Sequence, residues 1–424
     1  MNTGSMWEKT RLDVAVVGGG AAGMMAALQA AWAGAQVVLL EKNEKLGKKI
    51  YITGKGRCNV TNVADTEDFL RQVPRNGKFL NAAVRQFSHD DVTALLDMLG
   101  TPTKVERGGR VFPVSDKASD VTRALARGMR EAGVQVALNT AVGHVTAEEG
   151  GFALALEQGG TLHARCVVIA TGGASYPSTG STGDGYAFAR EIGHTVTPLR
   201  GSLVGLTIQE KWPQLLQGLS LKNVRVSAQV GGKRIYDELG EMLFTHFGVS
   251  GPLIIELSSH LPEDVSQARV LLDMKPGMTP EQVDQRLQRE FAENVRRQLS
   301  SVLASLMPAR MGPVFAMLCG LSPEQPINQI TREQRLTIAR MLKAMPLPVS
   351  GMRPLEEAIV TRGGVHVLEV APGTMMSRIA AGLFFAGEVL DVDAHTGGFN
   401  LQIAFSTGAL AGRSAAAFAA ERES

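Results

Sequence analysis

The first forty residues combine two apolar runs with a helical segment between them. Residues 12–17 (LDVAVV) are continuously apolar and rich in strand-forming residues, and the small residues GGGAAG follow. Ala-rich sequence continues to about Ala33, and Gly34 after it is typical of a helix C-terminus. A second apolar run, residues 36–40 (QVVLL), ends on Glu41. The pattern predicts strand, turn, helix and strand, which make one βαβ unit.

A helical pattern covers the next part of the chain, residues 69–133. It is clearest at residues 91–99 and 119–130, and it encloses a short strand-like stretch at 109–114. Strand patterns return in the sequence that follows, at residues 134–138, 151–156 and 166–170. We therefore expect a group of helices between the βαβ unit and further strands.

The middle of the chain changes in character twice. Residues 199–274 hold short alternating segments, such as 224–230 and 269–272, between Gly and Pro turns, which predicts a β-rich module. The sequence after them carries long amphipathic stretches, for example 281–306 and 331–345, and predicts helices.

Strand sequence reappears near the C-terminal end. Residues 383–386 (LFFA) precede Gly387 and Glu388, and an Ala-rich helix begins at about Gln402. The simplest architecture is a nucleotide-binding domain made from both ends of the chain and interrupted by an insertion. The predicted boundaries are a first segment at 1–198, a β-rich insert at 199–275, a helical insert at 276–345, a return through the β-rich insert at 346–375, and a second segment at 376–424.

Composition adds few constraints to this picture. The chain has 424 residues, 44% of them hydrophobic, and a net charge of +2, so two or three globular domains are expected and no strong attraction to polyanions. Its three cysteines, Cys58, Cys166 and Cys319, are far apart and odd in number, which argues against a disulfide framework and favours the reducing cytoplasm. No CxxC motif or Cys/His cluster indicates a metal site.

Targeting and membrane signals are weak. Residues 1–12 are polar and lack the apolar core of a signal peptide. Residues 21–40 carry no charge and are apolar enough for a membrane helix, but Gly34 divides them into a helix and a strand. We therefore expect no membrane association.

The glycine turn is the first candidate site. Gly18-x-Gly20-x-x-Gly23 lies between a strand and a helix, where Gly18 permits the tight turn, Gly20 lets the backbone approach a pyrophosphate and Gly23 allows close helix packing. The helix N-terminus favours the anion. Glu41 is positioned to accept hydrogen bonds from ribose hydroxyls and disfavours a 2′-phosphate, so FAD or NAD fits better than NADP. A glycine turn without a ligand is the alternative.

A second candidate segment, residues 47–62 (GKKIYITGKGRCNVTN), is rich in glycine and cations. Its basic side chains are suited to neutralising a diphosphate or an anionic reduced flavin, and its small polar side chains supply neutral hydrogen bonds. The basic residues are Lys48, Lys49, Lys55 and Arg57, and the polar ones are Asn59, Thr61 and Asn62. A solvated basic loop is the alternative.

Six motifs together make the chain resemble the BaiN-like (YhiN-like) family of FAD-dependent oxidoreductases over nearly its whole length. They are VVGGGAAGMMAA, ITGKGRCNVTN, ATGGASYPSTGSTGDGY, EMLFTHFGVSGP, VTRGGV and LFFAGEVLDVDAHTGGFNLQIAFSTG. The resemblance implies an α/β chain (α+β overall) with a two-segment Rossmann-type FAD-binding domain, an inserted β-barrel-like module and a small helical module. This agrees with the order of elements predicted above.

The resemblance also implies which residues bind FAD. It assigns Glu41 and Lys42 to the adenosine, and Lys49, Arg57, Cys58 and Asn59 to the flavin side. Gly18, Gly20, Ala22 and Gly23 form the fingerprint, and Thr171, Gly172 and Gly173 pass close to the cofactor. The C-terminal motif places Gly387 and Glu388 near the ribityl chain and phosphate, and Gly398, Phe399, Asn400, Leu401 and Gln402 at a helix N-terminus beneath the isoalloxazine. The partial positive charge there stabilises reduced flavin.

Four residues are candidates for catalysis. Cys58 has cationic neighbours that would depress a thiol pKa, although a packed cysteine is an equal alternative. His246 and His395 are candidate proton donors, because imidazole is an acid near neutral pH, and a structural role is the alternative for each. Arg362 is a candidate anchor for a substrate carbonyl or phosphate, with a surface ion pair as the alternative.

The predicted function is NAD(P)H-driven reduction of an activated C=C bond by a flavoenzyme. Only one dinucleotide fingerprint occurs, so NAD(P)H would bind transiently. Relatives in the family imply a small-molecule enone, such as an unsaturated 3-oxo bile acid, or a uracil of large-subunit ribosomal RNA. Residues 275–343 hold ten Lys/Arg and six Asp/Glu, a weak basic excess compatible with RNA. A flavin-dependent amine oxidase and a non-enzymatic flavin-binding protein are the remaining alternatives.

Overall fold

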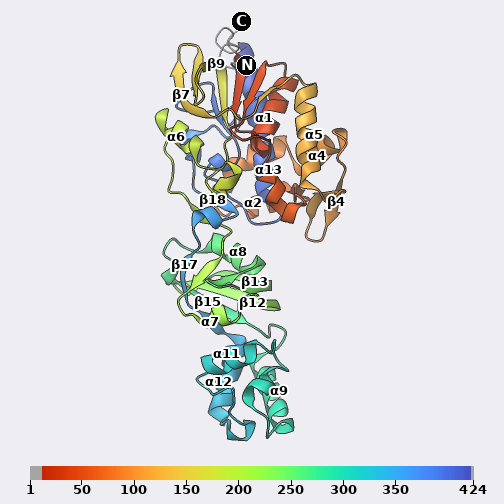
Figure 1. Cartoon of the computed structure of the whole chain (residues 1–424), viewed down its shortest axis with the longest axis vertical. Coiled ribbons are helices and arrows are strands. Elements are labelled where there is room, and N and C mark those ends of the chain that lie inside the picture. Colours follow the sequence, from red (N-terminus) through yellow and green to blue (C-terminus); the bar gives the residue numbers. More distant parts are fainter. Residues whose placement is uncertain (1–11, 422–424) are drawn as a thin grey trace. The chain divides into compact units, whose positions relative to one another are not determined.

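The computed structural model describes residues 12–421, which form two compact units (Figure 1). Unit 1 combines the N-terminal part up to Ser202 with the C-terminal part from Pro354, and unit 2 is Leu203–Arg353. Of the inserts expected in the sequence analysis, the helical one and residues 203–275 of the β-rich one thus lie in one compact unit, whereas residues 199–202 belong to unit 1. Residues 354–375, assigned there to the return through the β-rich insert, belong to unit 1.

Unit 1 is built on a seven-stranded mixed sheet. The strand order is β6-β2-β1-β9-β8-β7, and β19 pairs with the C-terminal part of β9. Strands β6, β2, β1, β9 and β19 run parallel, whereas β7, β8 and β9 pair antiparallel. Their bounds are β1 Leu12–Val17, β2 Val37–Leu40, β6 Gln135–Ala137, β7 Val142–Glu148, β8 Gly151–Leu156, β9 Thr161–Ile169 and β19 Leu383–Phe385.

The predicted βαβ unit is present at the start of this sheet. Strand β1 is followed by α1 (Ala21–Trp32), and Gly34, in the left-handed region with φ +93°, comes before β2. The uncharged stretch 21–40 is therefore a helix and a strand, as expected. No helix in the described part of the chain is long and apolar enough to cross a membrane.

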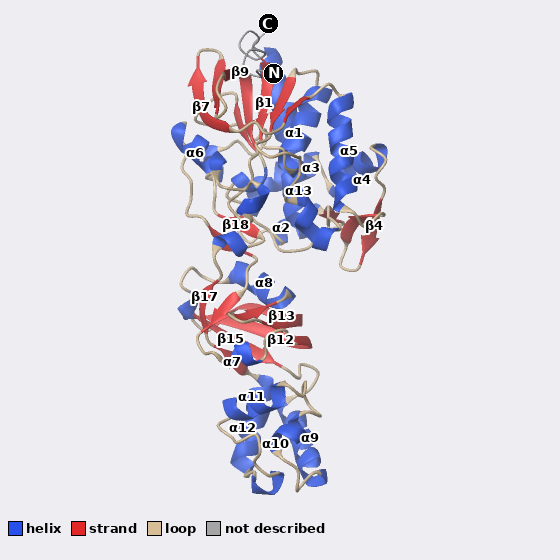
Figure 2. Cartoon of the chain, viewed as in Figure 1, coloured by secondary structure: helices blue, strands red, loops and turns tan. Residues whose placement is uncertain are grey.

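Helix α13 (Phe399–Glu421) brings the C-terminal end of the chain into the core of unit 1. It packs on α1 and on strands β1 and β9 (Figure 2). A Cβ on Gly408 would lie 2.4 Å from the carbonyl oxygen of Ala22, and one on Gly412 would lie 2.2 Å from that of Ala26. The two helices therefore approach so closely that no side chain fits at either glycine.

The remaining helices of unit 1 follow the sequence pattern in outline. The α-helices are α2 Thr66–Arg71, α3 Asn81–Gln86, α4 His89–Met98, α5 Ala118–Glu131 and α6 Asp184–Glu191. The 3₁₀ turns are η2 Ile50–Gly56, η3 Gly77–Leu80, η4 Pro177–Thr179, η7 Leu355–Glu357, η8 Val367–Glu369 and η9 Gly387–Val389. A capping box fixes the start of α4, where Ser88 and Asp91 exchange hydrogen bonds.

Two small sheets complete unit 1. The strand-like stretch near residue 110 is one strand of a three-stranded sheet of order β3-β5-β4, with bounds β3 Thr61–Asn62, β4 Thr103–Glu106 and β5 Arg110–Pro113. A two-stranded antiparallel sheet joins β10 (Arg200–Ser202) to β18 (Val360–Arg362). This pairing links the chain just before the insertion to the chain just after it.

Unit 2 holds a seven-stranded sheet of order β16-β15-β12-β13-β14-β11-β17 and a group of helices that share one core. The strands are β11 Leu206–Ile208, β12 Ser220–Val230, β13 Lys233–Phe244, β14 Gly248–Ser250, β15 Ala268–Asp273, β16 Met345–Leu347 and β17 Val349–Met352. The helices are α7 Trp212–Leu215, α8 Pro252–His260, α9 Pro280–Glu293, α10 Leu299–Leu303, α11 Met311–Leu318 and α12 Arg332–Lys343, with 3₁₀ turns η5 Val265–Gln267 and η6 Ile327–Gln329.

The amphipathic stretch at residues 281–306 is divided into two helices. Helix α9 ends at Glu293, and α10 begins only at Leu299. The Asn294 side chain donates to the carbonyl of Glu290, an alternative to the helical ladder, and the Gln298 carbonyl starts a new helix. Apolar periodicity continues through the break because both helices bury residues in the same core.

The close contact between α1 and α13 predicts what happens when a glycine there is replaced by a larger residue. We expect Gly412→Ala to lower the midpoint of thermal unfolding, because overpacking a core costs about 1–3 kcal/mol and exceeds the roughly 1 kcal/mol that alanine gains over glycine in a helix. Gly373→Ala is the control, since a Cβ there meets nothing within 4 Å. An unchanged or higher midpoint for Gly412→Ala, measured by calorimetry, would contradict the contact.

Candidate functional site

The carboxyl ends of four parallel strands meet at one edge of the main sheet. Strand β1 leads into Gly18, β2 into Glu41, β9 into the segment 170–173, and β19 into Gly387. In open α/β sheets, ligands bind outside this edge. The fold therefore gathers the predicted cofactor-binding motifs from both ends of the chain.

Space explains the three glycines of the fingerprint. A Cβ on Gly18 would lie 2.6 Å from the carbonyl oxygen of Ala170, and one on Gly23 would lie 1.8 Å from that of Gly18. These two glycines are required by the fold itself. A Cβ on Gly20 would meet nothing within 4 Å, and its backbone is extended with φ −81°. Of the three glycines, only Gly20 faces open space. This is expected of a position where the backbone must let a pyrophosphate approach.

Glu41 lies at the end of β2 and holds the glycine loop. Its carboxylate accepts hydrogen bonds from the Gly19 amide at 2.7 Å and from the amide and side chain of Asn43 at 2.8 and 2.7 Å. A carboxylate has about four acceptor positions, so one stays available for a ribose hydroxyl. Glu41 thus connects the loop to the site where the resemblance places the adenosine.

Two helices point their N-termini at this edge of the sheet. Helix α1 begins at Ala21 and α13 at Phe399, and neither has an acidic residue in its first turn. The first amides of a helix have no acceptor within the helix, and they carry its partial positive charge. Both termini suit an anionic group. Ala22 is the second residue of α1 and is buried beside the loop.

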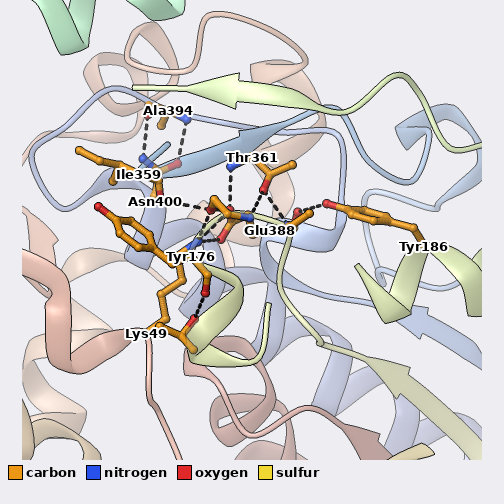
Figure 3. Close-up of polar contacts among 11 residues, drawn as sticks. Lys49, Tyr176, Tyr186, Ile359, Thr361, Glu388, Ala394 and Asn400 are labelled. Carbon is orange, nitrogen blue, oxygen red and sulfur yellow. Dashed lines mark hydrogen bonds and ion pairs between the residues drawn. The ribbon is translucent and has the colours of Figure 1, made fainter. Parts of the chain in front are cut away.

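Glu388 is the centre of a polar network in unit 1 (Figure 3). Its carboxylate accepts from Lys49 Nζ at 2.7 Å, from the amide of Thr361 at 2.7 Å and from Ser175 Oγ at 3.1 Å. Lys49 Nζ also donates to Ser175 Oγ at 2.7 Å. Tyr186 donates to the Glu388 carbonyl at 3.4 Å. The network therefore joins four segments that are distant in sequence.

Thr361 positions the loop that follows β9. Its Oγ1 accepts from the amides of Ala174 and Ser175 at 2.8 and 3.1 Å. A Cβ on Gly173 would lie 2.3 Å from that oxygen, so only glycine permits the approach. Neither Thr361 nor Ser175 was singled out from the sequence, although both lie in quoted motifs. Their position within these motifs was the sequence signal that could have identified them.

Two buried polar atoms in the predicted cofactor-binding segments have no hydrogen-bond partner among the described residues. They are Asn59 Oδ1 and Thr171 Oγ1. Buried polar groups are normally paired, so each calls for an explanation such as a ligand. Both belong to segments that the resemblance places beside the cofactor. Their chemistry fits a group rich in hydroxyl and ring N–H donors, such as FAD.

Two basic residues of the predicted site have protein partners. Arg57 donates to Asp116 at 2.8 Å and to Glu106 at 3.2 Å, and these carboxylates raise its pKa. Lys42 pairs with Asp184 at 2.6 Å. The charge of Arg57 is balanced by two carboxylates from the segment 104–116, and its assignment to the flavin side stays a prediction.

Cys58 does not have the depressed pKa that its neighbours suggest. Burial raises the pKa of its thiol to about 12, against the opposite effect of a hydrogen bond with Thr53. The residue sits in the left-handed region with φ 62°. Burial is the larger effect, and the basic residues near Cys58 in sequence are not among the groups that shift its pKa. Cys58 packs in the core, and its raised pKa favours the alternative of a packed cysteine over a thiolate.

The first turn of α13 is braced by its own side chains. Asn400 donates to the carbonyl of Ala394 at 2.7 Å and accepts from its amide at 2.9 Å. Gln402 donates to Phe87 O at 3.0 Å and accepts from Thr61 Oγ1. The side chain of Gln402 is thus turned to the protein interior, whereas Leu401 is half-buried. What remains at the helix N-terminus for a cofactor is backbone.

A glycine pair precedes α13. Gly398 has φ +103°, and a Cβ on it would lie 2.3 Å from the carbonyl oxygen of Thr61. On the other side of the site, Gly172 has φ +75° and Gly387 has φ +78°. These conformations let the chain turn sharply at the strand ends and before the helix.

The two candidate histidines lie in different units. His395 is buried, its amide donates to the Gln72 carbonyl at 2.9 Å, and its Nδ1 lies 3.1 Å from Gln72 Oε1. Helix α2 therefore holds the ring through the residue that ends it. His246 is exposed, follows β13 and belongs to unit 2, so it is not among the residues that unit 1 brings together.

Tyr176 has an unusual backbone. It lies in the left-handed region with φ 53° and ψ 60°, a conformation that bulky residues rarely adopt. Such strain costs about 1–3 kcal/mol and gathers at functional sites. Its half-buried phenol makes no hydrogen bond to other described residues. Tyr176 follows Ser175 of the Glu388 network, so its placement is fixed from that side.

Arg362 is at the end of β18 and pairs across the strands with Arg200. Burial lowers the pKa of Arg362, as do the charges of Arg75 and Arg200, while Asp393 and Asp391 oppose the shift. Arg362 is half-buried and two carboxylates act on its charge, so a substrate anchor and an ion pair both stay predictions for it. Arg75 and Arg200 carried no signal in the sequence, because only the fold brings them together.

Among the described residues no group of three or more His, Cys, Asp or Glu side chains is arranged to hold a metal ion. None of the three cysteines, all within the described residues, forms a disulfide.

The strand order, the glycine loop and the helix N-termini define the class of protein: a mixed α/β protein with a Rossmann-type FAD-binding domain, as predicted. The chain belongs to the family described as "HI0933-like protein Rossmann domain", whose model matches residues 12–414. The resemblance inferred from the six motifs is thereby confirmed.

Named relatives match over almost the full length. A "3-dehydro-bile acid delta(4,6)-reductase" of Clostridium scindens is 33% identical over 95% of this chain and 98% of its own. A "Ribosomal RNA dihydrouridine synthase" of Escherichia coli K12 is 32% identical over 94% of this chain and 96% of its own. Another of that name from Haemophilus influenzae is 29% identical over 92% of this chain and 95% of its own.

A solved structure shares the fold at low identity. The 3-ketosteroid-Δ4-(5α)-dehydrogenase of Rhodococcus jostii RHA1 has a TM-score of 0.53 and 15% identity, and the alignment covers 98% of each chain. The likeness supports the assignment of the fold.

The space in front of Gly20 predicts a variant that folds but loses the cofactor. We expect Gly20→Val to remain folded, since its backbone suits any residue and its Cβ meets nothing, and to lose FAD, since the side chain fills the pyrophosphate position. The measurement is FAD released by heat per mole of protein, together with the unfolding midpoint. Gly373→Val, also in open space, is the control. Normal FAD content in Gly20→Val would show that the site is misplaced.

Proposed function

We propose that this protein is an FAD-dependent oxidoreductase that uses NAD(P)H to reduce an activated C=C bond in a small-molecule enone. The observation that carries the proposal is the 33% identity, over 95% of the chain, to a protein named as a bile acid Δ4,6-reductase. The site supports it, because the strand ends, helix termini and unpaired polar atoms suit a flavin dinucleotide. A cytoplasmic location, in keeping with three cysteines that form no disulfide among the described residues, is part of the proposal.

The residues that would hold FAD are those at the sheet edge. The N-terminus of α1 would bind the pyrophosphate, and the free acceptor position of Glu41 the adenosine ribose. The Glu388 network would hold the ribityl side. The N-terminus of α13 would stabilise negative charge on the ring. When bound, FAD supplies hydride transfer to the substrate.

The protein's own part in the chemistry is to supply a proton and to polarise the substrate. Reduction of an enone places a hydride on the β-carbon and a proton on the α-carbon. His395 is the proposed donor, since the Gln72 contact fixes the ring and imidazole works near neutral pH. Tyr176 is the next candidate. Cys58 is a poor donor, because a thiol with a pKa of about 12 gives up its proton slowly at neutral pH.

A second candidate function is reduction of uracil to dihydrouridine in ribosomal RNA. The observation in its favour is that two relatives over more than 90% of the chain carry that name, at 32% and 29% identity. Uracil contains the same conjugated C=C–C=O unit as an enone. The same site would therefore serve for both reactions. The two functions differ in whether the double bond belongs to a small molecule or to an RNA.

Stopped-flow absorbance separates these functions. Under anaerobic conditions NAD(P)H should bleach the flavin, and a 3-oxo-Δ4 steroid acid should restore its absorbance. A ribosomal RNA fragment as the better oxidant of the reduced protein would favour the second function. Bleaching by an amine, with peroxide released in air, would show an amine oxidase. No bleaching by either nicotinamide would contradict the proposed reductant.

The proton donor can be tested by timing the two half-reactions. We expect His395→Ala to slow oxidation of the reduced protein by an enone about 10²- to 10⁴-fold, the usual contribution of a general acid, and to change reduction by NAD(P)H much less. His144→Ala is the control, because that side chain is 71% exposed. If only His246→Ala slows the oxidation, the donor comes from unit 2. If both variants are oxidised by the enone at the wild-type rate, Tyr176 becomes the candidate donor, and Tyr176→Phe tests it.

A further inference from the structure

A loop of unit 1 crosses the edge of the main sheet where the cofactor motifs meet. It starts at Thr171, two residues after β9, and returns at Gly185 in the first turn of α6. A Cβ on Gly185 would lie 2.2 Å from Thr171 Oγ1, so the two ends of the loop are in contact, as in an Ω-loop. Between these ends the chain makes two excursions, one to the end of β19 and one to the end of β2.

The first excursion is held firmly. The side chain of Ser175 is buried, accepts from Lys49 at 2.7 Å and donates to Glu388 at 3.1 Å. The amide of Tyr176 donates to the carbonyl of Glu356 at 3.3 Å. Glu388 follows β19, so these contacts fix this part of the loop at that strand end.

The second excursion is made by residues 177–182, called here the strap. Asn43 Nδ2 donates to the carbonyl of Thr179 at 3.2 Å, and Lys42 Nζ donates to Thr182 Oγ1 at 2.5 Å. Asn43 and Lys42 follow β2, so the strap reaches the opposite side of the edge from β19.

The strap also touches the segment after β9. Ser181 is buried, and a Cβ on Gly172 would lie 3.2 Å from its Oγ. The strand order at the edge is β2-β1-β9, with β19 beside β9, so the loop spans the ends of these four strands. An FAD that ran from Glu41 to Glu388 would have the same two end points. The strap is therefore placed to cover the cofactor site.

Few contacts keep the strap closed. Its sequence, PSTGST, has no large apolar side chain except proline, and Pro177, Ser178 and Thr182 are exposed. Lys42 and Asp184, which both hydrogen-bond the Thr182 hydroxyl, are 29% and 37% exposed, and such ion pairs contribute little to stability. A segment with few buried apolar contacts opens at a low cost in free energy.

The residues that flank the strap have left-handed backbones. Tyr176, labelled in Figure 3, has φ 53°, and Gly183 has φ +89°. Hinges are commonly a few residues in loops or at the ends of elements that absorb a change in φ and ψ. A bulky residue in the left-handed region is strained, so a movement of the strap can relieve Tyr176.

We propose that the strap closes over the FAD site and opens for the cofactor to enter or leave, with its contacts to Lys42 and Asn43 as the latch. The inference goes beyond the proposed function, because it concerns exchange of the cofactor and not the substrate. Asn43 also donates to Glu41 Oε1, and the other oxygen of that carboxylate accepts from the Gly19 amide. Closing the strap and binding the adenosine thus depend on the same side chains.

Exchange of FAD tests the latch. The FAD-loaded protein is mixed with excess 5-deaza-FAD, which absorbs at shorter wavelength, and the exchange rate is read from the absorbance. We expect Thr182→Val to raise this rate about tenfold, the factor that corresponds to loss of one hydrogen bond to a charged group. Gly180→Ala should act in the same direction, since a Cβ there would lie 2.3 Å from Asn43 Nδ2 and displace the strap. Ser178→Ala, also exposed and in the strap, is the matched control and should exchange as the wild type does.

The association rate distinguishes a gate from a fixed wall of the site. The latch joins protein atoms only, so breaking it destabilises the closed form equally with and without FAD. Thr182→Val apoprotein should therefore bind FAD faster by a factor similar to that for release, with the dissociation constant nearly unchanged.

A buried thiol gives a second readout of opening. Ser181→Cys places a small thiol under the strap, in a Cys319→Ala background because Cys319 is only half-buried. In the FAD-loaded protein we expect this thiol to react with a thiol reagent more slowly than that of Ser178→Cys, and faster when Thr182→Val is added.

The outcomes separate the inference from the proposed function. An unchanged exchange rate in both Thr182→Val and Gly180→Ala would overturn the strap as a gate. So would faster release without faster association, since Thr182 would then contact the cofactor itself. A Ser181→Cys thiol that reacts as fast as an exposed one, or no faster than buried Cys58, would overturn it too, because the strap would then be always open or always closed. A protein that exchanges FAD as expected, but is not reduced by NAD(P)H or oxidised by an enone, would instead overturn the proposed function.

Discussion

The carboxylate of Glu388 is the interaction on which the site depends. It receives Lys49 from the N-terminal part, Ser175 from the loop after β9, and the amide of Thr361 from β18. These segments are separated by more than a hundred residues each, and no local preference brings them together. Because one carboxylate accepts from all three, the strand ends stay in register with each other. The cofactor edge is therefore held by charge and hydrogen bonds beneath the place where a ligand would lie.

Close backbone approach is the second condition for this arrangement. Helix α13 reaches the cofactor edge only because Gly408 and Gly412 let it pack against the backbone of α1. Gly173 meets Thr361 in the same way. Any side chain at these positions would push the C-terminal part away from the N-terminal part. Glycine is therefore needed here mainly because it has no side chain. At the turns before α13 it is also needed because it can adopt a positive φ.

Charge is distributed unevenly over unit 1. Arg57, from the glycine-rich basic segment, is balanced by Glu106 and Asp116 and serves to fasten that segment to the small sheet. Arg362, by contrast, lies among other arginines, which lower its pKa together with burial. These two arginines, both in quoted motifs, thus have pKa values shifted in opposite directions. The difference lies in their burial and in their neighbours in space.

The sequence by itself determined the local pattern of the site. The βαβ unit, the fingerprint glycines, Glu41 and the helix after Gly34 follow from periodicity and turn chemistry within forty residues, where neighbours in sequence are neighbours in space. The family motifs likewise placed Lys49 and Glu388 in one site before their contact was seen.

Only the tertiary structure decided which side chains are available. Cys58 looked activated beside its basic neighbours, yet burial raises its thiol pKa to about 12. Gln402 looked like a cofactor contact, yet its amide is used by Thr61 and Phe87. Arg75 and Arg200 had no signal at all. Burial, pairing and repulsion depend on residues far apart in the chain, and a linear pattern does not contain those distances.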